Sequence, residues 1–135
     1  MNHVLIVDDE ADIRDSLEAI LREEDYAITT AGTAKEALEL IRDADYQAVL
    51  LDIWLPDGDG LDVLSQIRNQ PRNPAQTNGA PAPGTPEVIM ISGHGTIEAA
   101  VRATKLGAFD FLEKPLGMER TLLVVQHALE ARRLR

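Results

Sequence analysis

Four short apolar segments of this sequence are each followed closely by residues whose side chains could take part in phosphoryl chemistry. These residues are the pair Asp8 and Asp9, then Asp52, Ser92 and Lys114. An aspartate beside a divalent cation and a lysine is equipped for phosphoryl transfer, because the two cations neutralise the phosphoryl oxygens while the carboxylate attacks in line. The acyl phosphate that results is a recognised use of aspartate as a nucleophile. Asp52 is therefore the candidate nucleophile.

Each of these residues, taken alone, also has an ordinary structural interpretation. Asp9 could cap the following helix, and Asp52 could begin a turn that precedes residues 56–58. Ser92 could supply a turn hydroxyl, and Lys114 could be a surface lysine. In an open α/β sheet, however, ligands bind outside the carboxyl ends of the strands. The ordinary interpretations would need four coincidences at one sheet edge, so the sequence favours a shared site.

Charge balance in that site predicts a metal ion. Two carboxylates about 4 Å apart repel by about 4 kcal/mol at an effective dielectric constant near 20. Asp8, Asp9 and Asp52 with Lys114 leave two negative charges, which a divalent cation would neutralise. Because the ligands would be oxygen atoms and the chain has no cysteine, the expected ion is Mg²⁺ or Mn²⁺.

The elements that must position these residues can be read from two alternating hydrophobic patterns. Short apolar runs predict strands at His3–Val7, Tyr26–Thr30, Ala48–Leu51, Val88–Ile91 and Phe109–Leu112. Apolar residues at helical spacing predict helices around Ile13–Leu21, Ala34–Ile41, Leu61–Ile67, Ile97–Thr104 and Leu122–Leu129. A capping box of Thr33 and Glu36, an N-cap at Asp59 and a terminal glycine at Gly107 support these boundaries.

This alternation predicts an α/β fold of the (βα)5 type, a doubly wound five-stranded parallel sheet with helices on both faces. The expected strand order is 2-1-3-4-5, which is the established order of flavodoxin-like folds rather than a consequence of these residues. The length of 135 residues fits one domain, 1–135, whose last helix at 119–135 runs toward a linker.

One segment breaks the pattern. Asn69–Glu87 contains five of the seven prolines and has no hydrophobic period, so we expect a flexible insertion between the third helix and the fourth strand. It is either a tolerated insertion or a docking surface for a partner.

Composition excludes several classes of protein. The net charge is −10 and no basic stripe precedes the last few residues, which argues against direct nucleic-acid binding by this domain. No stretch approaches the ~20 apolar residues of a membrane span. The opening residues do not form a signal peptide, so a cytoplasmic protein is expected.

Four sequence motifs, in order and spacing, resemble the receiver domain of two-component response regulators. They are VDDE (Val7–Glu10), LDIWLPDGDG (Leu51–Gly60), ISGHG (Ile91–Gly95) and FDFLEKP (Phe109–Pro115). The resemblance covers nearly the whole chain. It implies a signalling domain that assists its own phosphorylation and dephosphorylation, rather than an enzyme with a separate substrate.

The resemblance also implies a role for each matching position in the phosphorylation site. Asp52 corresponds to the phosphorylated aspartate, Asp9 to the direct acidic metal ligand and Asp8 to the acidic residue that acts through water. The backbone carbonyl of Trp54 would complete the metal site, and Lys114 corresponds to the phosphate-contacting lysine.

Further positions correspond to the conformational switch of that family. Ser92 matches the switch hydroxyl and Phe111 the switch aromatic residue, although Phe111 could also be a plain core residue. The Lys114–Pro115 peptide bond is expected to be cis. Trp54 and His94 could screen an acyl phosphate from water, or Trp54 could simply face solvent or a partner.

The stretch Ile91–Pro115 is most similar to receivers of the NtrX/NtrC-like group, which usually precede an ATPase domain acting on sigma-54 polymerase and a DNA-binding domain. The implied partners are a sensor histidine kinase, a second copy of the chain after phosphorylation, and those output domains. The alternative is a stand-alone receiver that works as a phosphorelay or protein-interaction switch.

Other classes fit the residues less well. A dehalogenase-type phosphatase needs a second aspartate two positions after the first, where this chain has Trp54. A flavodoxin-like redox protein needs a hydroxyl-rich loop where Asp8 and Asp9 stand, and no GxxxxGK[ST] nucleotide loop is present. A degenerate receiver that only docks partners would not need to keep Asp52, Ser92 and Lys114.

Overall fold

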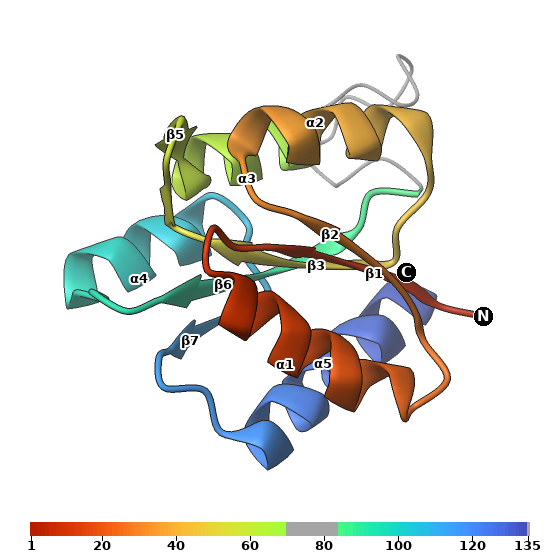
Figure 1. Ribbon diagram of the computed structural model, residues 1–135. Coiled ribbons are helices and arrows are strands. Elements are labelled where there is room, and N and C mark those ends of the chain that lie inside the picture. The colour runs from red at the N-terminus through yellow and green to blue at the C-terminus, as the bar shows by residue number, and fades with distance from the viewer. Residues whose placement is uncertain (70–83, 135) are drawn as a thin grey trace.

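The computed structural model describes residues 1–69 and 84–134, which form a parallel sheet covered by helices on both faces (Figure 1). The strands are β1 (His3–Val7), β2 (Ala27–Ala31), β3 (Ala48–Asp52), β4 (Trp54–Leu55), β5 (Gly58–Asp59), β6 (Glu87–Ser92) and β7 (Asp110–Glu113). The helices are α1 (Ala11–Arg22), α2 (Ala34–Asp43), α3 (Gly60–Asn69), α4 (Ile97–Lys105) and α5 (Met118–Arg133).

The main sheet has the strand order β2-β1-β3-β6-β7, and all four pairings are parallel. Because β6 and β7 are its fourth and fifth strands, this is the predicted order 2-1-3-4-5, and the predicted fold class is confirmed. The antiparallel hairpin of β4 and β5, which follows β3 directly, was not predicted from the sequence. Its strands have two residues each, too short for any hydrophobic period to show.

The core lies in two layers, one on each face of the sheet. Successive strand residues point to opposite faces. Leu5 and Val7 therefore pack with the residues of α2, α3 and α4, whereas Val4 and Ile6 pack with α1 and α5. Figure 1 shows the same division, with α2 and α3 on one side of the sheet and α1 and α5 on the other. The buried strands β1, β3 and β6 each end at or just before a polar residue, so a site can form at the carboxyl ends of these strands.

Local hydrogen bonds place the helix boundaries close to the predicted ones. Thr33 Oγ1 accepts a hydrogen bond from the Glu36 amide at 3.1 Å, and Asp59 Oδ1 accepts one from the Leu61 amide at 2.8 Å. The strands β2 and β7 begin and end one residue later than predicted. Their pairing with β1 and β6, rather than local hydrophobicity, sets these ends.

The predicted insertion Asn69–Glu87 lies mostly outside the described residues; its first residue ends α3 and its last begins β6. In the described part of the chain, no helix is long and apolar enough to cross a membrane.

Gly107 follows α4 with a φ of +100°, and a Cβ there would lie 2.7 Å from Arg68 Nε. We expect Gly107→Ala to lower the free energy of unfolding by about 1–2 kcal/mol, because alanine is strained at positive φ and the arginine must move. Urea unfolding measures this. Gly117→Ala is the control, because its Cβ would meet nothing closer than 3.9 Å and its φ is −80°. Equal stability of the two variants would contradict the argument.

Candidate functional site

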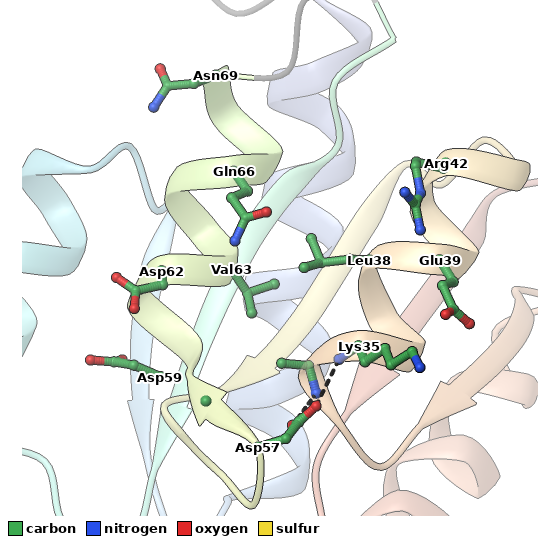
Figure 2. Close-up of a pocket in the computed structure, with 12 residues that line it drawn as sticks. Lys35, Leu38, Glu39, Arg42, Asp57, Asp59, Asp62, Val63, Gln66 and Asn69 are labelled. Carbon is green, nitrogen blue, oxygen red and sulfur yellow. Dashed lines mark hydrogen bonds between the residues drawn. The ribbon is translucent and has the colours of Figure 1, made fainter.

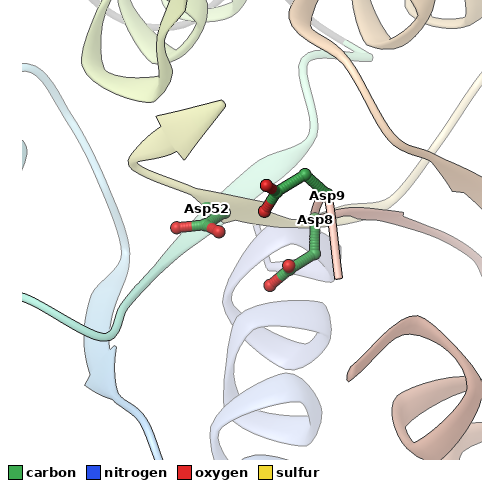
Figure 3. Close-up of side chains that lie close together, drawn as sticks. All are labelled: Asp8, Asp9 and Asp52. Carbon is green, nitrogen blue, oxygen red and sulfur yellow. The ribbon is translucent and has the colours of Figure 1, made fainter. Parts of the chain in front are cut away.

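The strand ends bring the predicted site residues together at one edge of the sheet. Asp8 follows β1, Asp52 ends β3, Ser92 ends β6 and Lys114 follows β7. The amide of Lys114 donates to the carbonyl oxygen of Ser92 at 2.9 Å, which joins the ends of the neighbouring strands β6 and β7. The carboxylates of Asp8, Asp9 and Asp52 each place an oxygen within 4.8 Å of the others (Figure 3).

Lys114 is the cation at the centre of this group. Its Nζ lies 3.0 Å from Asp8 Oδ2 and 3.2 Å from Asp52 Oδ2. It also lies 3.1 Å from Glu10 Oε2. Asp8 and Asp52 are buried, whereas Glu10 is exposed and its charge is screened by water. The lysine therefore compensates the two carboxylates that solvent reaches least.

Burial is the main electrostatic influence on Asp52. It raises the pKa of the Asp52 carboxyl, and the charge of Asp8 raises it further. A hydrogen bond from the Trp54 amide to Asp52 Oδ1, 3.1 Å long, and the ammonium group of Lys114 lower the pKa by less. For Lys114, burial alone would lower the pKa, but the hydrogen bonds to Asp8 and Glu10 and the charge of Asp52 outweigh it, so the pKa is raised. The lysine stays charged at any physiological pH.

The donor set fits a hard divalent cation. It consists of three carboxylates with no thiolate or imidazole among the grouped residues. Asp8 Oδ1 accepts a hydrogen bond from the Glu10 amide at 2.9 Å. Asp8 Oδ2 is buried and, apart from the Lys114 ammonium, has no polar partner among the described residues. Carboxylate oxygens with lone pairs that Lys114 does not use are suitable ligands for Mg²⁺, a hard cation that binds oxygen atoms.

Comparison with known proteins agrees with this geometry. The response regulator receiver domain family matches residues 4–126. The chain belongs to this family. The nitrogen assimilation regulatory protein NtrX of Azorhizobium caulinodans is 42% identical over 134 residues, covering 98% of this receiver and 27% of that protein. The response regulator protein PilR of Pseudomonas aeruginosa is 41% identical over 128 residues, covering 95% of this receiver and 26% of that protein. The receiver therefore spans about a quarter of the length of these curated relatives.

Solved structures give the same assignment. The receiver domain of NtrX from Brucella abortus is 44% identical with a TM-score of 0.79, covering 94% of this receiver and 98% of that chain. The beryllofluoride-activated NtrC4 receiver domain dimer is 43% identical with a TM-score of 0.83, covering 98% and 99%. The resemblance to NtrX-like response regulators is confirmed.

The predicted switch residues of the receiver lie around the same edge. Ser92 is buried, and its Oγ accepts a hydrogen bond from the His94 amide at 3.0 Å. Phe111 is half-buried against the core layer of α2, α3 and α4, and its ring lies so close to Gly95 that a Cβ there would be 3.0 Å away. Trp54 is 63% exposed and meets the His94 ring edge-on, with centroids 6.5 Å apart. The Lys114–Pro115 peptide bond is cis.

Three residues of the receiver site were not assigned a role from the sequence. Glu10 pairs with Lys114. Arg14 Nη1 donates to the carbonyl oxygen of Asp8 at 2.6 Å. Asp57, in the turn of the β4–β5 hairpin, accepts hydrogen bonds from the start of α2. The place of Glu10 directly after the two aspartates was the one available signal; the other two contacts depend on tertiary packing.

Proposed function

We propose that this receiver domain accepts a phosphoryl group on the Asp52 side chain from the phosphohistidine of a sensor kinase in the cytoplasm. The observation that carries the proposal is the convergence of Asp8, Asp9, Asp52 and Lys114 at one sheet edge. A carboxylate oxygen of Asp52 forms the new bond to phosphorus as the bond to the histidine nitrogen breaks. The ammonium group of Lys114 neutralises the transferred oxygens.

The acidic group would hold Mg²⁺ or Mn²⁺ through Asp9, Asp52 and the backbone carbonyl of Trp54, with Asp8 acting through water. When bound, that ion supplies positive charge to the phosphoryl oxygens. The residues of the chain align the nucleophile: the Trp54 amide holds one oxygen of Asp52, and Lys114 approaches the other.

Intact mass after incubation with Mg²⁺ and a small phosphodonor tests the proposal. We expect the wild-type chain to gain one phosphoryl group and Asp52→Asn to gain none, because an amide is not a nucleophile of this kind. Asp62→Asn, which removes an exposed carboxylate on α3, is the control and should be phosphorylated normally. Unmodified wild-type protein, or a modified Asp52→Asn variant, would refute the assignment.

Phosphorylation would change the conformation of the surface formed by α4, β7 and α5, and Ser92 and Phe111 would transmit this change. A hydrogen bond from Ser92 to the phosphoryl group supplies about 1.5–3 kcal/mol. Moving a population from 1:99 to 99:1 requires about 5.5 kcal/mol. Contacts of Lys114 or self-association must therefore add to the hydrogen bond of Ser92.

Self-association is supported by exposed apolar side chains on this surface: Ile97 and Val101 on α4, and Leu123 on α5. We infer that phosphorylation strengthens a homodimer, and the activated NtrC4 receiver is itself described as a dimer. By analogy with NtrX, the output would be an ATPase domain acting on sigma-54 polymerase and a DNA-binding domain. The alternative is a stand-alone receiver in a phosphorelay.

The edge-on pair of Trp54 and His94 stands beside the site and would limit the access of water to the acyl phosphate. We expect Trp54→Ala to speed the loss of the phosphoryl group by about threefold, equivalent to ~0.7 kcal/mol of barrier. The decay of phosphorylated protein, followed by intact mass, measures this. Leu134→Ala removes an exposed apolar side chain just after α5 and serves as the control. An unchanged decay rate for Trp54→Ala would mean that the indole does not shield the site.

A further inference from the structure

Asp57 joins the hairpin next to the phosphorylation site to a helix on the far side of a groove. Its Oδ1 accepts a hydrogen bond from the Ala34 amide at 2.7 Å, and its Oδ2 accepts one from the Lys35 amide at 3.0 Å (Figure 2). Both donors belong to the first turn of α2. The carboxylate thus connects the hairpin to α2, because Asp57 lies 23 residues after Ala34 and 22 residues after Lys35 in the sequence.

The start of α2 is capped from two directions. The first four amides of a helix have no partner within the helix. Thr33, the N-cap residue of α2, accepts a hydrogen bond from the Glu36 amide through its side chain. Asp57 takes two more from a distance, and its negative charge lies at the positive end of the helix dipole. These backbone hydrogen bonds lower the pKa of the Asp57 carboxyl, so it is charged at neutral pH.

The hairpin itself needs such an anchor. It pairs only Trp54 with Asp59 and Leu55 with Gly58, and a two-stranded ribbon this short is not stable alone. The Gly60 amide closes its base by donating to the carbonyl oxygen of Ile53 at 2.7 Å, and Leu55 is buried beneath it. In the described part of the chain, the carboxylate of Asp57 joins the turn between its strands to α2 by two hydrogen bonds.

The first residue of this hairpin also contacts the nucleophile. The Trp54 amide donates to Asp52 Oδ1, and the Trp54 carbonyl is the proposed backbone ligand of the metal ion. A displacement of the hairpin would move both groups relative to Asp52.

We propose that Asp57 is a positioning residue, which clamps the hairpin to the first turn of α2 and so holds the Trp54 backbone where Asp52 and the metal ion require it. This inference rests on the proposed function of the site. It concerns a residue that touches neither the phosphoryl group nor the ion.

Mg²⁺ binding measured by calorimetry tests the clamp in the intact chain. We expect Asp57→Ala to raise the dissociation constant of Mg²⁺ by about three- to tenfold, less than the 10–100-fold typical of residues that touch a metal ligand directly. Asp62→Ala removes an equal charge from α3 on the same groove and should change it by less than about twofold. Asp57→Asn keeps one acceptor oxygen and should fall between them.

A second variant breaks the same contact without removing the charge. Ala34→Pro removes the N–H group that donates a hydrogen bond to Asp57 Oδ1. Proline is well tolerated at the first position of a helix, which Ala34 occupies in α2. Thr33 already has the extended backbone, φ −138° and ψ 161°, that a following proline demands. Ala34→Pro leaves the hydrogen bond from the Lys35 amide to Asp57 Oδ2, so it should weaken Mg²⁺ binding by less than Asp57→Ala does. The double variant should bind Mg²⁺ no more weakly than Asp57→Ala alone.

Amide hydrogen exchange supplies a readout without metal. Asp57→Ala should speed exchange of the Trp54 amide, whereas Asp62→Ala should not. Identical Mg²⁺ affinity and Trp54 exchange in Asp57→Ala and Asp62→Ala would overturn the clamp and leave Asp57 as a cap of α2 alone. A wild-type chain that binds no Mg²⁺ would instead overturn the proposed function, and the positioning role with it.

Discussion

Replacing Lys114 with methionine is expected to lower the free energy of unfolding at pH 7 without Mg²⁺ by about 2–3 kcal/mol. Removing one partner of a fully buried ion pair costs about 3–5 kcal/mol, and the rim of this site is open to water, so the cost here is smaller. The ammonium group lies within 3.2 Å of both Asp8 and Asp52, which are almost fully buried. Methionine leaves those charges repelling each other with no cation between them.

Mg²⁺ should reverse this loss. An ion that binds only the folded state stabilises it by RT ln(1 + [L]/Kd). Because Lys114 repels a cation from the acidic group, its removal should tighten Mg²⁺ binding, and the same concentration of Mg²⁺ should stabilise Lys114→Met more than wild type. Urea unfolding with and without Mg²⁺ measures both effects. Lys105→Met, on the exposed face of α4, is the control. A Lys114→Met variant as stable as Lys105→Met without Mg²⁺ would contradict the charge argument.

The pH dependence of this variant follows from Asp52. Burial, and then the charge of Asp8, raise the pKa of Asp52 above its ordinary 3.8, and Lys114 opposes them. A carboxyl with a raised pKa in the folded state contributes stability below its unfolded pKa, and that contribution is lost as pH rises through the folded pKa. Without Lys114 the folded pKa of Asp52 rises further. The difference in free energy of unfolding between wild type and Lys114→Met should therefore become smaller as pH falls from about 7 toward 4.5, where more of the Asp52 carboxyl is protonated.

The convergence of the acidic residues could be predicted from sequence because parallel topology alone brings strand ends together. Asp8, Asp52 and Ser92 each follow or end a buried apolar run, and the register of a parallel sheet places such residues at one edge. No side-chain detail is needed for that inference. The same logic found Lys114, whose strand pairs with β6.

The contacts of Glu10, Arg14 and Asp57 could not be predicted in this way. Each depends on where a side chain turns after its backbone is placed, and each partner lies in another segment. In the sequence Asp57 looks like a turn residue between Pro56 and Gly58, and it does occupy a turn. Its hydrogen bonds to α2 appear only once the hairpin is packed against that helix.

Gly60→Ala is the second substitution expected to have a large effect. A Cβ at Gly60 would lie 2.1 Å from the carbonyl oxygen of Asp52 and 2.8 Å from Ile53 Cα. Both neighbours are backbone atoms of the strand end and loop that carry the nucleophile, so no side-chain rotation can relieve the clash. We expect a loss of about 3 kcal/mol or more in the free energy of unfolding, at the upper end for overpacking.

The clash should also affect phosphorylation, because Asp52 must shift if α3 is to keep its position. Phosphorylation by a small donor should slow in Gly60→Ala under conditions where the variant is still folded. Gly58→Ala, in the same hairpin, meets only Ala34 Cβ at 3.6 Å and should leave both stability and phosphorylation close to wild type. A well-folded Gly60→Ala that is phosphorylated at the wild-type rate would show that the start of α3 can move away from Asp52. In that case the close approach of helix and strand would not be what holds the nucleophile.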